Sequence, residues 1–216
     1  MTADLHLGDV VVARERIPAL RGHGRNAATR DDKALIAAHD EAIAAIWADL
    51  VGPRDVVWIL GNITVERWRA TPGATPPLDL LAGLPGRKRL VYGHYDDAHP
   101  VRGSAYKGDV AQLAARTFTW DGLAGTVLLD GTAAMCSHFP YDGVGAGGRA
   151  RHQTWRLRDQ HIPIVHGHTR SSARYSESVR GTPQINVGLD AWQLAPVHID
   201  DVSLTLHSLG SHLAAF

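Results

Sequence analysis

One long amphipathic segment lies in the first quarter of the chain. Between residues 31 and 50, apolar side chains recur at intervals of three and four, the period of one face of an α-helix. They are Leu35, Ile36, Ile43, Ile46, Trp47 and Leu50. Asp31 and Asp32 stand at the start of the segment and Gly52-Pro53 follows it, so both ends carry helix boundary signals. The pattern predicts a helix over 31–50.

The rest of the chain contains short apolar runs that end at glycine, proline or polar residues, a pattern typical of β-strands. The runs are 56–60, 89–92, 126–129, 133–136, 162–165, 184–187 and 202–206. The run from Val56 to Leu60 is apolar throughout, which indicates a strand covered on both faces. Helical patterns at 78–84 and 109–116 can supply part of a covering layer. The sequence predicts a layered α/β (α+β) fold with stacked sheets, in a single domain over 1–216.

Composition excludes several classes of protein. Lys plus Arg (22) equal Asp plus Glu (22) among 216 residues, so no net charge draws the chain onto nucleic acid or an anionic membrane. Cys136 is the single cysteine, which excludes thiolate zinc fingers, iron–sulfur scaffolds and a disulfide framework. The 13 histidines leave imidazole metal chemistry open. Because no apolar run approaches the ~20 residues of a membrane span, we expect a cytoplasmic protein that is not inserted in a membrane. The balanced charge likewise predicts no general binding to nucleic acid.

Potential ligands follow the predicted strands, each beside a glycine or another small residue. The segments are Gly61-Asn62, Gly93-His94-Tyr95-Asp96, Ser137-His138 and His166-Gly167-His168. Rigid strands position side chains accurately, while the adjoining loops leave room for a substrate. This arrangement predicts an active site at one rim of a sheet.

Five blocks of residues resemble, in order and spacing, those of the calcineurin-like metallophosphoesterases. They are Asp4-Leu5-His6, Gly61-Asn62, Gly93 to Asp96, Ser137 to Tyr141, and His166 to Arg170, with Asn186 to Trp192 extending the resemblance almost end to end. The resemblance implies a four-layer αββα sandwich of two mixed β-sheets flanked by helices. It also implies that Asp4 and His6 hold one metal ion and that His138 and His168 hold a second. Two ions bridged by a carboxylate bind phosphate oxygens and activate water for in-line attack.

The chain departs from this family pattern at several ligand positions. Asn62 replaces the bridging Asp, and His94 replaces an Asn that binds metal in the family. Tyr95 replaces the His that assists protonation of the phosphate or the leaving group, and Arg170 replaces the last His of the fifth block. Asp9 also stands where relatives often have His. Because Arg170 brings a fixed positive charge, we expect the first ion position to be weak or lost.

The second ion position gains an imidazole from His94. Together with His138 and His168 it predicts a site of three imidazoles, completed by Asn62 or water, for one ion of Mn, Zn, Fe or Ni rather than two. The alternative is that these are inherited, hydrogen-bonded histidines without a metal. For Asp4 and His6 the alternative to metal binding is a carboxylate paired with Arg170.

Residues beside the ligands have side chains that can contact a substrate or support the ligands. Tyr95 and Arg170 are expected to position the substrate, with Asp96 grouped beside them as a catalytic candidate. Asp9 and His166 are expected to support the ligands or contact the substrate. For Arg170 the alternative to positioning the substrate is a salt bridge with Asp4 or Asp9.

The remaining histidines and two other features fall outside the motif. His39 is expected in the core, and the others on the surface or in loops: His23, His99, His152, His161, His198, His207 and His212. Cys136 is expected to be a buried thiol. Residues 143–148 match Gly-x-Gly-x-x-Gly, but they do not follow a predicted strand, so a flexible loop is favoured over a dinucleotide site.

The sequence therefore predicts a metal-dependent hydrolase that acts on a small phosphomonoester, a phosphodiester or a nucleotide. The alternative is a catalytically inactive protein of the same fold that binds a nucleotide or phosphate, or regulates a phosphorylated partner. Missing ligands favour the alternative, and the retained histidines favour the enzyme.

Overall fold

A computed structural model describes residues 1–20, 32–65, 68, 77–105, 109–142 and 152–213. The α-helices are α1 (Val10–Leu20), α2 (Asp32–Leu50), α3 (Pro77–Gly83), α4 (Asp109–Thr117) and α5 (Ile199–Leu213). The strands are β1 (Val56–Ile59), β2 (Arg87–Val91), β3 (Phe118–Gly122), β4 (Ala124–Leu129), β5 (Thr132–Ser137), β6 (Ile164–His166), β7 (Tyr175–Glu177) and β8 (Pro183–Asn186). Short 3₁₀ helices are η1 (Pro100–Ala105), η2 (Gln153–Trp155) and η3 (Leu189–Ala191).

The strands form two sheets of different kinds. The smaller sheet has the order β1-β2-β3 and is parallel, because α3 and α4 provide the crossovers that parallel strands need. The larger sheet has the order β4-β5-β6-β8-β7 and is mixed, with antiparallel pairs at both edges. The expectation of two mixed sheets is therefore right for the larger sheet and wrong for the smaller one.

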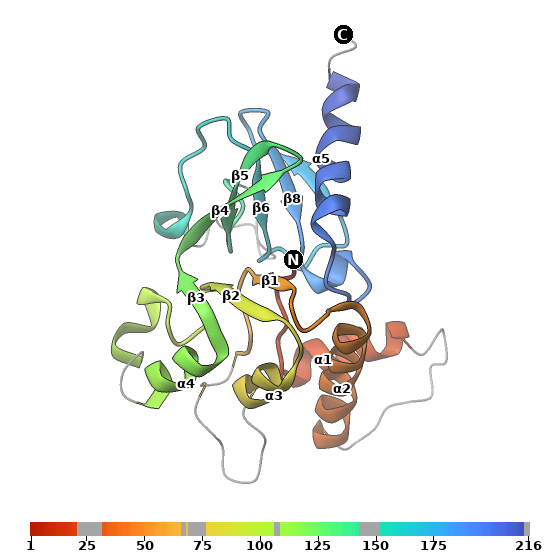
Figure 1. Cartoon of the computed structure of the whole chain (residues 1–216), viewed down its shortest axis with the longest axis vertical. Helices are drawn as coiled ribbons and strands as arrows, with labels where there is room; N and C mark the ends of the chain where they lie inside the picture. The colour runs from red at the N-terminus through yellow and green to blue at the C-terminus, as the bar shows by residue number, and fades with distance from the viewer. Residues whose placement is uncertain (21–31, 66–67, 69–76, 106–108, 143–151, 214–216) are drawn as a thin grey trace.

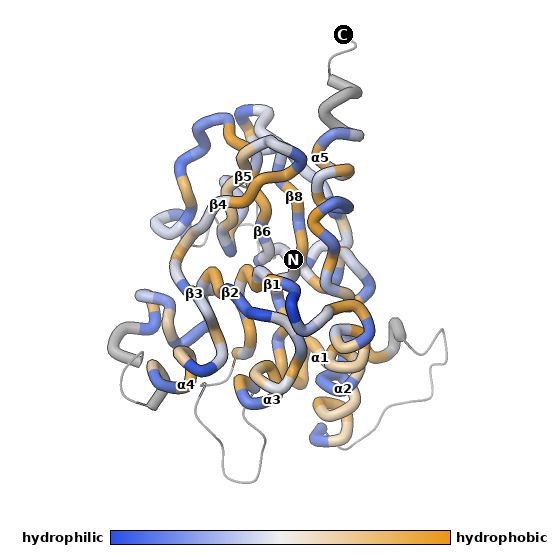
Figure 2. The backbone as a smooth tube through the Cα atoms, viewed as in Figure 1, coloured by the Kyte–Doolittle hydropathy of each residue, from blue (hydrophilic) through white to orange (hydrophobic). Residues whose placement is uncertain are grey.

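The layers follow the predicted sandwich. Figure 1 shows α1 to α4 on one side of the smaller sheet and α5 along the larger sheet. One core lies between the helices and the smaller sheet, around Trp47, Trp68 and Leu90, and the second joins the two sheets to α5. Figure 2 shows apolar stretches along the strands of both sheets. The α+β sandwich is confirmed, and both sheets direct strand ends toward one region between them.

Most of the predicted elements are confirmed, with one clear exception. The helix over 31–50 is α2, and the patterns at 78–84 and 109–116 are α3 and α4. The run 202–206, expected as a strand, lies inside α5. Its apolar residues alternate, but Val202 and Leu206 are buried whereas Leu204 is 65% exposed, which is a helical spacing. The sequence patterns did not single out α1, β3 or β7.

Three further points concern predicted features. His39 is buried and Cys136 is buried, and burial raises the pKa of the Cys136 thiol to about 12, so both core predictions are confirmed. The glycine-rich segment 143–148, Asp31 and His23 lie outside the described residues. Within the described part, no helix combines the length and apolarity needed to cross a membrane.

Candidate metal centre between the two sheets

The ends of β1 and β2 meet through two glycines. Gly61 has a φ of +64°, and a Cβ placed there would lie 2.2 Å from Gly93 N, so this position requires glycine. A Cβ at Gly93 would lie 2.4 Å from Asn62 Oδ1. Asp96 fastens the two loops, since its carboxylate accepts hydrogen bonds from Gly93 N at 2.7 Å and Ile63 N at 2.9 Å. This close approach holds both loops at the rim of the smaller sheet.

Asp96 is fully buried beneath this rim. Burial raises its pKa to about 7, although the two backbone N–H donors favour the ionised form. Asp96 therefore holds the two loops together in the structure. The catalytic role expected for it from the sequence remains a prediction.

Three imidazoles converge from both sheets. His94 follows β2, His138 follows β5, and His168 follows β6, and one ring nitrogen of each lies within 4.8 Å of the others. Their ring centroids are separated by 5.3, 5.1 and 5.1 Å. A tetrahedral ion bound at about 2.0–2.1 Å from each nitrogen would hold the centroids roughly 5.2 Å apart. The spacing therefore fits a single ion held by three histidines.

The hydrogen bonds and protonation of the three rings also suit a metal ligand. His138 Nδ1 donates to Leu60 O at 2.8 Å, which leaves the lone pair of Nε2 facing His94 Nδ1 at 3.1 Å. His168 Nδ1 is buried and has no hydrogen-bond partner among the described residues. Burial, with the neighbouring imidazoles, lowers the pKa of His94 to about 2 and of His168 to about 3, and burial lowers that of His138. All three rings are therefore neutral, the state that binds metals.

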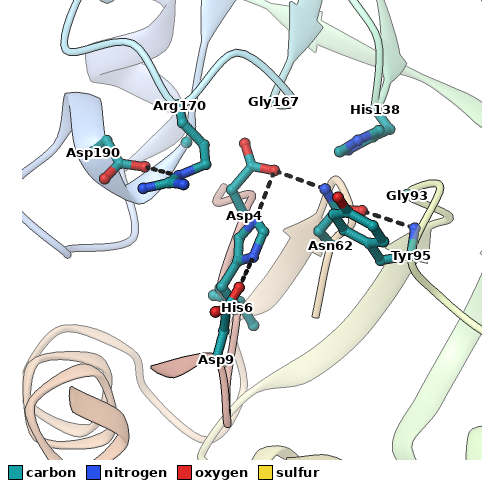
Figure 3. A network of polar contacts seen from close by, with 12 residues as sticks. Asp4, His6, Asp9, Asn62, Gly93, Tyr95, His138, Gly167, Arg170 and Asp190 are labelled. Carbon is teal, nitrogen blue, oxygen red and sulfur yellow. Dashed lines mark hydrogen bonds and ion pairs between the residues drawn. The ribbon is translucent and has the colours of Figure 1, made fainter. Parts of the chain in front are cut away.

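Asp4 and His6 lie beside this group and are both buried. His6 Nδ1 contacts Asp9 Oδ2 at 3.1 Å, while His6 Nε2 lies 3.8 Å from Asp4 Oδ1 (Figure 3). Burial opposes the ionisation of Asp4, but its contacts with His6 and the neighbouring imidazoles outweigh burial and lower its pKa. Burial lowers and the two carboxylates raise the pKa of His6, with a net increase. Among the described residues, Asp4 Oδ2 and His6 Nε2 have no hydrogen-bond partner.

Asn62 joins the two halves of the site. Its Oδ1 accepts a hydrogen bond from Tyr95 N at 3.1 Å, and its Nδ2 donates to Asp4 Oδ1 at 3.3 Å (Figure 3). The amide oxygen is thus engaged by the backbone, and the NH₂ group is directed to the carboxylate. A metal-binding role for Asn62 remains a prediction, and it would require the oxygen to serve both Tyr95 and the ion.

Arg170 pairs with residues other than those expected. Its guanidinium forms an ion pair with Glu15 and lies 3.8 Å from Asp190 Oδ2. The alternatives in which it pairs with Asp4 or Asp9 are therefore wrong for the described structure. Its Nε is buried without a hydrogen-bond partner among the described residues and is the atom that faces Asp190. A substrate-positioning role for Arg170 remains a prediction.

Arg16, which the sequence patterns did not single out, holds the Asp4 loop. Its side chain forms a bidentate pair with Asp190 at 3.0 and 2.8 Å and donates to the backbone oxygens of Asp4 at 2.8 Å and Leu5 at 3.0 Å. Asp4 and His6 both have positive φ, at 54° and 51°, which non-glycine residues rarely adopt. Helix α1 therefore fixes a strained segment, and its own start is capped by Asp9.

Two histidines expected in loops or on the surface lie near the site. His152 packs on His94 with ring centroids 4.6 Å apart, and His99 is buried against Trp155. His166 is buried, and its Nδ1 donates to Gly167 O at 2.8 Å, so it contacts the backbone rather than the three-histidine group. Burial lowers the pKa of His166 to about 4. In the sequence, only the ordered blocks of the family pattern indicated that His94, His138 and His168 are candidate metal ligands. His152 carries no comparable signal.

The fold and the three imidazoles define an α+β sandwich protein with a candidate metal centre. No family model matches the chain. The chain is 38% identical over 197 residues to the gene 66 protein of Mycobacterium phage D29, covering 88% of this chain and 87% of that protein. It is 36% identical over 196 residues to the gene 66 protein of Mycobacterium phage L5, covering 88% and 86%. The chain belongs to the family of these mycobacteriophage gene 66 proteins.

The fold also occurs in a solved structure. A protein of unknown function from Aquifex aeolicus, AQ665, matches with a TM-score of 0.56 and 17% identity, covering 93% of this chain and 95% of that one. This match supports the fold alone. A novel archaeal phosphodiesterase matches with a TM-score of 0.37 and 15% identity, covering 69% and 74%. That score is too low to support an inference.

Proposed function

We propose that the protein is a metal-dependent phosphoesterase with one ion, held by His94, His138 and His168. The observation that carries the proposal is the spacing of these three neutral imidazoles, whose centroids lie 5.1 to 5.3 Å apart. A divalent ion of Mn, Zn, Fe or Ni would supply Lewis acidity for a phosphoryl oxygen and lower the pKa of water. The substrate class is a small phosphomonoester, a phosphodiester or a nucleotide.

The chain's own residues divide the remaining tasks. Tyr95 is 36% exposed beside His94, so its hydroxyl can donate a hydrogen bond to a phosphate oxygen. The unpartnered oxygen of Asp4 can accept a hydrogen bond from water. Arg170 can bind a phosphate once its guanidinium releases Glu15. The phosphate and the Glu15 carboxylate are both anions, so they compete for the same N–H donors.

Elemental analysis and turnover test this proposal together. The purified protein is expected to bind about one ion per chain and to hydrolyse p-nitrophenyl phosphate or bis-p-nitrophenyl phosphate when Mn or Zn is supplied. His168→Ala is expected to lose both properties. His198→Ala, at a side chain that is 71% exposed, is the matched control and should retain both. A wild-type protein that binds no ion and shows no turnover with added metal contradicts the proposal.

The inactive alternative has one specific observation in its favour. The NH₂ group of Asn62, not an oxygen, faces Asp4, so the carboxylate bridge of a two-ion centre is missing. On this alternative the protein binds a phosphate or nucleotide without turnover, and the combined change Asn62→Asp, His94→Asn, Tyr95→His and Arg170→His creates an activity. A natural protein more active than this variant would rule the alternative out.

A further inference from the structure

The ring of His94 has fewer hydrogen bonds to orient it than the ring of His138. His138 is tied to Leu60 O through Nδ1, on the side of the ring away from the group. Within the described residues, the only hydrogen bond of His94 joins its Nδ1 to His138 Nε2 at 3.1 Å. An ion that took both nitrogens as ligands would replace this bond. The direction of the His94 ring must then be set by packing.

His152 supplies such packing from another part of the chain. Its ring lies 4.6 Å from that of His94 with an interplanar angle of 35°, and it stacks on Phe139 at 5.5 Å and 28°. Its contact with His168 is edge-on, at 6.0 Å. The buried Phe139 thus backs the ring that rests on His94.

The backbone of His152 is also held in an uncommon conformation. His152 precedes η2 as its N-cap residue with a φ of 64°, in the left-handed region. No side-chain hydrogen bond caps η2, so capping by the imidazole does not account for the residue. Non-glycine residues keep such conformations where the surrounding structure fixes them, often at functional sites.

We propose that His152 is a positioning residue that stacks on His94 and keeps its Nδ1 directed at the ion. His152 is not a ligand, since its nitrogens are outside the group whose atoms lie within 4.8 Å of one another. This inference rests on the proposed metal centre. It assigns the role to the flat ring of His152 and not to its nitrogen atoms.

Metal affinity of matched variants tests the inference. His152→Phe keeps a flat ring without nitrogens, and His152→Ala removes the ring. Dissociation constants for Zn²⁺ and Co²⁺ are measured by calorimetry, together with the Co²⁺ absorption spectrum. His152→Ala is expected to weaken binding about 10- to 100-fold, the range for residues that orient a ligand. His152→Phe should bind with nearly wild-type affinity and an unchanged Co²⁺ spectrum, and His198→Ala should match the wild type.

The outcomes separate this inference from the metal centre itself. If His152→Phe binds as weakly as His152→Ala, the nitrogens matter and the stacking role is overturned. If His152→Ala binds as tightly as the wild type, His152 has no positioning role. A wild-type protein without metal affinity, or one whose His168→Ala variant binds equally well, removes the centre and the inference with it. Circular dichroism monitors folding, and His152→Gln replaces His152→Ala, with the same expected weakening, if that variant does not fold.

Discussion

Replacement of Gly61 by alanine tests the close approach that builds the rim of the site. The added Cβ would lie 2.2 Å from Gly93 N and 2.4 Å from Gly93 Cα. Both atoms belong to the backbone, so neither can rotate away as a side-chain end would. The loops after β1 and β2 must therefore separate, and His94, the next residue after Gly93, must move with its loop.

The expected cost has two parts. Alanine at the φ of +64° found at Gly61 costs about 1–2 kcal/mol, because its Cβ crowds the adjacent carbonyl. Forcing a methyl group into a packed contact costs a further ~1–3 kcal/mol. The sum is about 2–5 kcal/mol, a large share of the 5–15 kcal/mol that typically stabilises a protein. In a chain of this size it lowers the Tm by roughly 4–20 °C.

Urea unfolding of Gly61→Ala against two controls separates the parts. Gly181 has a φ of +72° but no atom within 4 Å of its Cβ position, so Gly181→Ala carries the backbone strain alone. Gly83 has open space and no positive φ, so Gly83→Ala should unfold like the wild type or be slightly more stable. Gly61→Ala should lie about 1–3 kcal/mol below Gly181→Ala. Equal unfolding free energies for those two variants would refute the reasoning about the loop contact.

Three further predictions concern residues around the site. The pKa of His166 falls from 6.5 to about 4 through burial, so the unfolded chain protonates first, and stability present above pH 6.5 is lost as the pH falls to 4. The loss is roughly 3 kcal/mol, and urea unfolding from pH 7 to 4.5 should show a shallower loss for His166→Gln. Arg16→Met leaves Asp190 without its bidentate partner and should cost about 3–5 kcal/mol in urea unfolding, with Arg16→Lys in between. Asp9→Ala removes the oxygen that accepts the first N–H groups of α1 and should lower the Tm by an amount equivalent to about 1 kcal/mol, whereas Asp9→Ser should lose much less.

The order of helices and strands was largely predictable because the sequence carries it locally. Helix α2 has 19 residues, so its buried positions recur over about five turns and the helical period can be recognised in the sequence. The segment 202–206 is too short to distinguish a helical period from a strand period, and its alternating apolar residues predict a strand. In the structure Val202 and Leu206 share one buried face of α5. Helix α1 is shorter than α2, and its Arg16 contacts Asp190 and the backbone of the Asp4 loop. Such long-range contacts leave no local pattern.

The site was predictable to the extent that it lies at strand ends. His94, His138 and His168 each follow a strand that the sequence predicted, so their convergence could be anticipated. The ring of His152 could not, because it reaches His94 from an irregular segment with a left-handed backbone. The partner of Arg170 was also unpredictable, since Glu15 lies on the helix that the patterns did not reveal.

The residue types at positions 62 and 94, Asn62 and His94, both fit the proposed centre with one ion. The Asn62 side chain lies 3.3 Å from Asp4 Oδ1. Two carboxylates at that distance would repel by about 5 kcal/mol at an effective dielectric constant of 20, unless a cation or a shared proton lay between them. The neutral amide replaces this repulsion with a hydrogen bond, and His94 brings the number of imidazoles at the other position to three. The absence of a bridging carboxylate and the presence of a third histidine therefore both fit the proposed centre, in which His94, His138 and His168 hold one ion.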